Sequence, residues 1–174
     1  FMHIGMDISQ IAHQGGVATY LNNLSEELSK LKGLEMVYFF SSLRKKAPLN
    51  IGGNIKRYRL PPTFFEILFN RWRNIPIEKF IGDIDIFHSS DWTQPPTKAK
   101  KVTTYHDVVP LKFPQWSHPK IVEVHKRRLK LVEKEIDRVI AVSESTKQDL
   151  MKVSSIPEEK ITVVYEGPTS DFKP

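Results

Sequence analysis

The sequence alternates short, nearly continuous apolar runs with segments of helical periodicity, and this alternation constrains the fold more than any other feature. The first apolar run, 2–8, precedes the segment 16–31, in which apolar side chains recur at steps of three and four residues. Continuous apolar strands are typical of parallel sheets that are buried on both faces. The pattern therefore predicts an α/β, Rossmann-like fold, a mostly parallel sheet with helices on both faces.

The same alternation continues along the chain. The segments 9–15 and 106–116 lack either pattern, and we expect them to be irregular. With 174 residues and 40% hydrophobic composition, the chain has the size of one domain with a substantial core. The other expected strands are 35–40, 55–60, 84–88, 101–105, 138–143 and 161–165, and the other expected helices are 64–72, 76–82, 118–135 and 144–153.

Composition excludes several classes of protein. The chain has no cysteine, so it has neither disulfides nor a thiol nucleophile. No stretch approaches the roughly 18 apolar residues that cross a bilayer, so we expect a cytoplasmic protein whose contact with the inner face of the membrane is at most peripheral. The aromatic segment 64–72 is interpreted as core, and an interfacial helix that contacts the membrane is the alternative interpretation. The net charge of +6 is spread over small groups, so we do not expect a nucleic-acid partner.

Two loops that follow early strands carry side chains suited to ligand binding, since ligands of open α/β sheets gather at the carboxyl ends of the strands. Gly15 and Gly16 precede a helix, where glycine allows close approach of the backbone and helix-start N–H groups favour anions. A tight turn explains the same glycines. Asp91 and Trp92 combine a carboxylate with an indole ring that suits a sugar, and a capped turn is the alternative interpretation.

Two later loops are further candidates. His106 and Asp107 follow the strand expected at 101–105, where a structural histidine is the alternative to a functional one. Ser143 and Glu144 stand at the start of an expected helix, and an N-cap accounts for at least one hydroxyl there. The sequence contains no serine-nucleophile elbow, zinc-binding helix or calcium loop, so neither a hydrolase nor a metal site is expected.

Taken together and in order, these loops resemble the N-terminal domain of the group 1 (family 4 type) retaining glycosyltransferases, which have the two-domain GT-B fold. The resemblance covers residues 2–174 and implies a single N-terminal Rossmann-like domain that ends at the interdomain linker, with the C-terminal donor-binding domain absent. The stretches that carry it are GGVATY at 15–20, DIFH at 85–88, TYHDVVP at 104–110, RVIAVSES at 138–145, VVYEG at 163–167 and FKP at 172–174.

The resemblance implies a transferase that moves a sugar from a nucleotide-diphosphate-sugar donor to a carbohydrate or lipid-linked acceptor with retention of anomeric configuration, without a cofactor or metal. The fragment alone is expected to be inactive without the missing C-terminal domain. Two alternatives remain open: a stand-alone α/β binding module for a small phosphorylated ligand, and a structural domain with a basic docking face.

The resemblance also implies roles for single residues. His106 is expected to contact the transferred sugar and Asp107 to shape the same pocket, while Gly15 and Gly16 are expected to lie near the donor phosphates and the acceptor. A further set comprises Asp91 and Trp92 for the acceptor, and Ser143, Glu144 and Glu166 as secondary positions. Glu166 stands where many relatives have asparagine, which leaves a contact there open.

Overall fold

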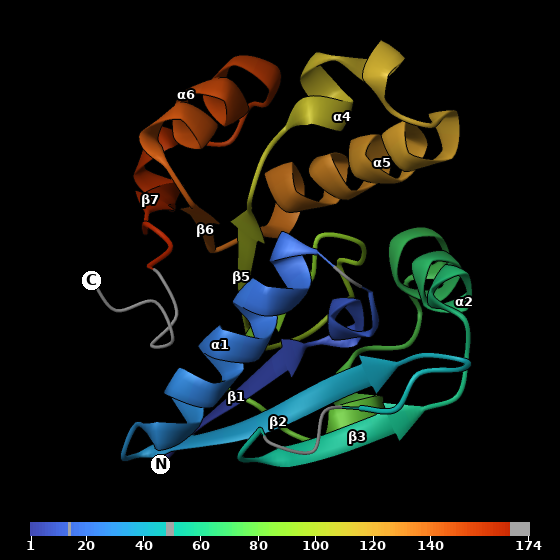
Figure 1. Ribbon diagram of the computed structural model, residues 1–174, viewed down its shortest axis with the longest axis vertical. Coiled ribbons are helices and arrows are strands. Elements are labelled where there is room, and N and C mark those ends of the chain that lie inside the picture. The colour runs from blue at the N-terminus through green and yellow to red at the C-terminus, as the bar shows by residue number, and fades with distance from the viewer. Residues whose placement is uncertain (14, 48–50, 168–174) are drawn as a thin grey trace.

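The computed structural model describes residues 1–13, 15–47 and 51–167 (Figure 1). Within these residues, seven parallel strands form one sheet in the order β3-β2-β1-β4-β5-β6-β7. The sheet confirms the predicted Rossmann-like fold, and the strand order changes direction between β1 and β4, the place where such sheets bind ligands. The strands are β1 (Met2–Asp7), β2 (Leu34–Ser41), β3 (Asn54–Tyr58), β4 (Ile86–Ser89), β5 (Lys100–Tyr105), β6 (Arg138–Ala141) and β7 (Ile161–Val163).

Helices connect the strands. Most of these helices match the predicted segments within a few residues. The FKP stretch at 172–174, which is part of the family resemblance, lies outside the described residues. The longer helices are α1 (Gly16–Lys30), α5 (Pro119–Glu135) and α6 (Glu144–Val153). The shorter ones are α2 (Pro62–Glu66), α3 (Glu78–Ile81) and α4 (Val109–Lys112), together with η1 (Ser9–Ala12), η2 (Ile67–Trp72), η3 (Pro114–Trp116) and η4 (Glu158–Lys160).

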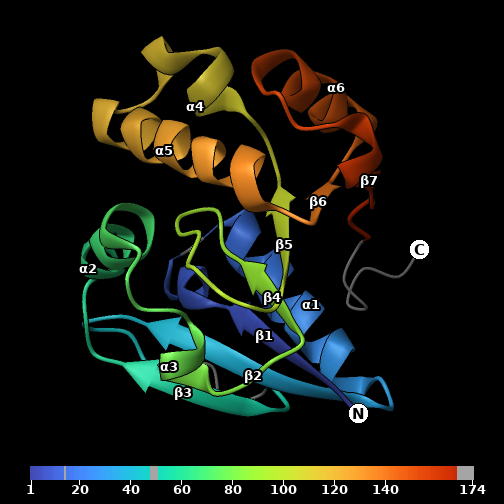
Figure 2. The same ribbon diagram turned by 180° about the vertical axis from the view of Figure 1, so that it is seen from behind.

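Helices cover both faces of the sheet, because successive side chains of a strand point to opposite faces. Tyr38 and Phe40 of β2 pack with Leu21 of α1, whereas Phe39 packs with Phe65 of α2 on the opposite face. Figure 2 shows α3 lying over β2 and β3 on this second face. A third apolar cluster joins α5 and α6 to β5 and β6, and it includes Tyr105, Leu129, Val132, Val139 and Leu150.

The aromatic segment 64–72 forms α2 and continues as the π-helix η2. Phe65 and Phe69 are buried in the core, which confirms the core interpretation for these two rings. Phe64 and Trp72 are 41% and 67% exposed. Membrane contact through the exposed rings stays an alternative interpretation.

The expectation of irregular chain at 106–116 is wrong in part, because this stretch contains α4 and η3. Oδ1 of Asp107 accepts a hydrogen bond from the N–H of Val109 at 2.8 Å, which supports the first turn of α4. Pro110 stands within that first turn, where its missing N–H costs nothing. The loop 9–15 likewise contains one short turn, η1, after Oδ1 of Asp7 accepts a hydrogen bond from Ser9 N–H at 2.9 Å.

Candidate functional site

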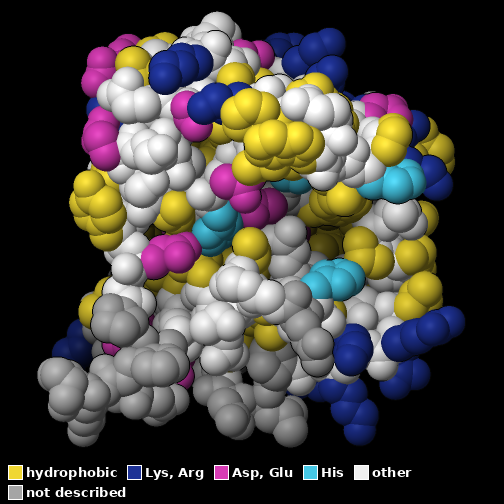
Figure 3. Space-filling view, turned by 45° about the horizontal axis from the view of Figure 1, so that its top comes forward, with side chains coloured by type: hydrophobic (Ala, Val, Ile, Leu, Met, Phe, Trp, Pro, Cys, Tyr) yellow, Lys and Arg dark blue, Asp and Glu magenta, His cyan; other side chains and the backbone are white. Residues whose placement is uncertain are grey.

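The imidazole of His106 lies between two carboxylates from distant parts of the sequence. Its Nδ1 is 2.9 Å from Oε1 of Glu166, which follows β7, and its Nε2 is 3.9 Å from Oδ2 of Asp91, which follows β4. The parallel strands deliver all three residues to the same edge of the sheet. In Figure 3, which brings the top of the molecule forward, acidic and histidine side chains lie around a hollow.

A buried chain of polar groups lies beneath His106. Both Nε2 of His88 and the hydroxyl of Tyr20 contact Oγ1 of Thr104, at 2.9 and 3.2 Å. The Tyr20 ring also meets the His106 ring edge to face, with centroids 4.7 Å apart. Burial, helped by the charges of His106 and Arg128, lowers the pKa of His88 to about 4. His88 is therefore neutral at neutral pH and acts as a structural hydrogen-bonding group.

Arg128 of α5 is the buried cation of this region, with only 1% of its surface exposed. Its NH2 group donates to Oγ1 of Thr103 at 2.5 Å and lies 3.9 Å from Oδ1 of Asp91. The guanidinium also lies 4.3 Å from the centroid of the Tyr105 ring. Sequence reasoning missed Arg128, because it stands within a basic run typical of solvated helix faces. We call His106, Asp91, Glu166 and Arg128 the His106 cluster.

The remaining predicted residues near His106 have local structural contacts. The Asp107 side chain is directed to the start of α4, as described above. Ser143 is the N-cap of α6 and accepts a hydrogen bond from Thr146 N–H at 3.0 Å, which confirms the capping interpretation. The Thr146 hydroxyl donates to the carbonyl of His106 at 3.1 Å, so this helix start holds the His106 backbone. Glu144 is exposed and pairs with Gln148 at 3.0 Å, away from the cluster.

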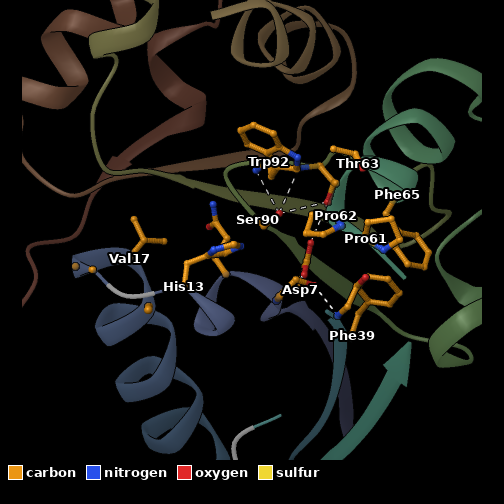
Figure 4. Close-up of a pocket in the computed structure, with 17 residues that line it drawn as sticks. Asp7, His13, Val17, Phe39, Pro61, Pro62, Thr63, Phe65, Ser90 and Trp92 are labelled. Atoms are coloured by element: carbon orange, nitrogen blue, oxygen red, sulfur yellow. Dashed lines mark hydrogen bonds between the residues drawn. The ribbon is translucent and has the colours of Figure 1, made fainter. Parts of the chain in front are cut away.

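A cavity of about 510 Å³ adjoins the His106 cluster, and Trp92 connects the two, because Trp92 lines the cavity while its neighbour Asp91 faces His106. Figure 4 shows Trp92 on one side, Asp7 and Phe39 opposite, and His13 and Phe65 at the two ends. We call this space the apolar cavity. Its lining is Asp7, Ser9, Gln10, His13, Gly15, Gly16, Val17, Ala18, Phe39, Ser41, Pro61, Pro62, Thr63, Phe65, Ser90, Trp92 and Thr93.

Gly15 and Gly16 form one end of this cavity at the start of α1. Gly15 has a φ of 139°, a conformation that favours glycine, and serves as the N-cap of the helix without a side-chain cap. A Cβ built on either residue meets no atom within 4 Å. The first turn of a helix also leaves backbone N–H groups without intrahelical partners. The two glycines therefore present an open backbone surface that suits an anionic group.

Two further properties concern metal and membrane. Among the residues that the structure describes, no group of three or more His, Asp or Glu side chains has the arrangement to hold a metal ion. Within the same ranges, no helix combines the length and apolar character that crossing a membrane requires.

Comparison with solved structures shows the same fold in larger proteins. Anabaena HepE, solved in complex with UDP, is 13% identical with a TM-score of 0.54, over 96% of this chain and 44% of its own. The lipopolysaccharide outer core galactosyltransferase WaaB, solved in its apo form, is 15% identical with a TM-score of 0.56, over 97% of this chain and 46% of its own. The chain thus spans less than half of either protein.

Comparison of the sequence itself gives the family. No curated protein matches the chain. The family model described as Glycosyltransferase Family 4 matches residues 14–170, which include the cavity glycines and the His106 cluster. The chain belongs to glycosyltransferase family 4, and its fold is that of the N-terminal half of a GT-B glycosyltransferase.

Proposed function

We propose that the protein transfers a sugar from a nucleotide-diphosphate sugar to an acceptor with retention of anomeric configuration. Residues 2–174 form the N-terminal domain, which supplies the acceptor side and part of the sugar and phosphate pocket. One observation carries the proposal: His106, its two carboxylate neighbours and the open start of α1 lie at the same edge of a sheet of the glycosyltransferase family 4 fold. The structure of HepE with UDP supports a nucleotide sugar as donor.

In this proposal His106 contacts the transferred sugar. A carboxylate accepts hydrogen bonds, so the contact with Glu166 favours the form of His106 that carries hydrogen on Nδ1. Its Nε2 lies 3.9 Å from Oδ2 of Asp91, which leaves room for a hydrogen bond between this nitrogen and a sugar hydroxyl. Such a contact orients the sugar and supports its oxocarbenium-like transition state. Asp107 shapes this pocket indirectly, since its carboxylate stabilises α4.

The start of α1 is the proposed phosphate contact. The helix dipole and the free N–H groups beside Gly15 and Gly16 favour the negative charge of a diphosphate. Trp92 lines the same cavity as this helix start, and Asp91 faces His106. Both residues are proposed to contact the acceptor. Ser143 acts through the turn that holds the His106 backbone, and Glu144 is secondary.

A C-terminal domain of the same protein is proposed to provide the remaining donor contacts, so residues 2–174 alone are inactive. No cofactor or metal is proposed. We place the protein in the cytoplasm, with peripheral contact at the inner face of the membrane where the acceptor is lipid-linked.

The first test is transfer and hydrolysis by the full-length protein with a panel of UDP-, GDP- and ADP-sugars. We expect turnover of one donor class and a kcat/KM at least about 100-fold lower in His106→Ala, the usual scale for losing a transition-state contact. His3→Ala is the matched control, because His3 lies at the amino end of β1 and pairs with Glu35, far along the strand from the site. The control is expected to keep full activity.

The other outcomes refute particular parts of the proposal. A folded full-length protein that turns over no donor would favour a binding module for a phosphorylated ligand. A product whose anomeric configuration, measured by NMR, is inverted would refute retention. Equal transfer rates for residues 2–174 and the full-length protein would show that the second domain is not required.

A further inference from the structure

The apolar cavity presents mainly carbon atoms to a ligand. Most of its accessible wall belongs to apolar atoms. Two aromatic rings of the second face, Phe39 and Phe65, and the rings of Pro61 and Pro62 form one end and the floor, and Trp92 lies across from them (Figure 4). Cavities of this size and character are typical binding sites for small molecules.

The buried carboxylate of the wall, Asp7, is already satisfied by the protein. The two oxygens of Asp7, which is 3% exposed, each accept a hydrogen bond at 2.9 Å, one from Ser9 N–H and one from the Thr93 hydroxyl. Its carboxylate therefore ties η1 to the loop after β4. Since both carboxylate oxygens already accept hydrogen bonds within the protein, Asp7 is a poor partner for a ligand hydroxyl.

The serine hydroxyls of the wall are used in the same way. Ser9 Oγ accepts from Ser41 N–H at 3.0 Å, and the Ser41 hydroxyl donates to the carbonyl of Leu60 at 2.8 Å. Ser90 Oγ accepts from the N–H groups of Trp92 and Thr93, both at 3.3 Å. These hydroxyls hold loops together, whereas Oε1 of Gln10 and Nε1 of Trp92 are buried without a partner among the described residues. Apolar atoms still form most of the surface that a ligand meets.

A carbohydrate group buried in such a cavity would lose water around its hydroxyls and find few partners in return, whereas an apolar group would gain from leaving water. We propose that the apolar cavity binds an alkyl group of the acceptor, which makes the acceptor an amphipathic molecule. The alkyl group lies at the Pro61 and Phe65 end. The acceptor hydroxyl then lies at the His13 and Val17 end, beside the start of α1 (Figure 4).

This inference rests on the proposed function, because only a transferase makes the bound molecule an acceptor. Its test does not depend on sugar transfer. The probes are octyl β-D-glucoside and methyl β-D-glucoside, which share a sugar and differ in the alkyl group. Binding of each to the full-length protein is measured by isothermal titration calorimetry, below the micelle concentration and without donor. We expect the octyl compound to bind at least about tenfold tighter, because burial of several methylene groups favours it.

Matched variants locate the binding. Ala18→Phe places a ring in the cavity and is expected to remove the preference for the octyl compound. Thr19→Phe adds the same ring at the next position of α1, which is exposed and outside the lining, and should keep it. Thr63→Trp narrows the cavity from an exposed position and gives a second test that does not depend on how Ala18→Phe folds.

Equal affinity for the two glucosides would overturn the inference. An octyl preference that Ala18→Phe and Thr63→Trp both leave intact would also overturn it, because the alkyl group would then bind elsewhere. If Ala18→Phe and Thr63→Trp remove the octyl preference but no donor is turned over, alkyl binding in the cavity is supported and the proposed transferase activity is refuted. If sugar is transferred efficiently to short polar acceptors by Thr63→Trp, the transferase stands and the inference fails.

Discussion

In the apolar cavity the carboxylate of Asp7 is held by two hydrogen bonds of 2.9 Å, whereas in the His106 cluster the carboxylate of Asp91 lies 3.9 Å from both Arg128 and His106. The two carboxylates belong to adjoining parts of one site. The first is used to fasten loops around an apolar space. The second retains hydrogen-bonding capacity that a ligand can use. The comparison teaches that stability should depend on the cavity wall, and chemistry on the cluster.

The largest expected effect is on the wall. Phe65→Ala should lower the free energy of unfolding by about 3–5 kcal/mol, the range for removing a buried phenylalanine. The Phe65 ring is 1% exposed, and its centroid lies 4.9 Å from that of Phe39 and 5.3 Å from that of Phe69. Urea unfolding followed by circular dichroism measures the loss. Asp91→Asn, in the cluster, should lower the same quantity by less, because Asp91 lies 3.9 Å from the buried Arg128, beyond hydrogen-bonding distance.

The contrast between the two regions is refuted if Asp91→Asn lowers the free energy of unfolding more than Phe65→Ala does. A loss of less than about 1 kcal/mol in Phe65→Ala would show that the wall relaxes around the missing ring. A larger loss in Asp91→Asn would show that the cluster carries stability as well.

The next effect concerns the buried histidine beneath the cluster. The pKa of His88 is about 4 in the folded protein and near 6.5 in the unfolded chain, so below pH 6.5 the unfolded state takes up a proton that the folded state does not. Stability is therefore unaffected by His88 above pH 6.5 and falls as the pH drops from 6.5 to about 4. At about 1.4 kcal/mol per pKa unit, the full loss is on the order of 3 kcal/mol.

Urea unfolding at a series of pH values between 7 and about 4 tests this dependence. His88→Gln keeps an amide in reach of Thr104 but cannot titrate, so its stability should fall less steeply over the same interval. Parallel curves for the two proteins would show that another group causes the acid sensitivity.

The smallest expected effect is at the boundary between the two regions. Gly16→Ala should leave stability unchanged or raise it by up to about 1 kcal/mol, because the added Cβ meets no protein atom within 4 Å and alanine favours the helix. The kcat/KM of the full-length protein should nevertheless fall about tenfold, because the methyl group occupies the space of the proposed phosphate. Thr19→Ala, on the same helix, is the control. An unchanged kcat/KM in Gly16→Ala would show that the donor phosphates do not lie at this helix start.

Part of the site could be predicted because its signals are local. An apolar strand, a pair of glycines and a helical pattern predict where α1 begins, and Ser143 before a helix predicts its N-cap. The single turn of α4 was missed, since four residues carry too little periodicity and the turn depends on the side chain of Asp107. The contact of Glu166 with His106 also lay beyond local signals, because 60 residues separate the two.

By itself, the sequence determined the α/β class, the approximate elements and the four loops at the carboxyl ends of the strands, because apolar periodicity and capping act over a few residues. The tertiary structure decided which of these loops meet. It placed Arg128, within a basic run of α5, beside Asp91, and it turned the polar side chains around Asp7 toward one another so that the cavity between them became apolar. Contacts of this kind depend on strand order and on packing between distant segments, which no local pattern encodes.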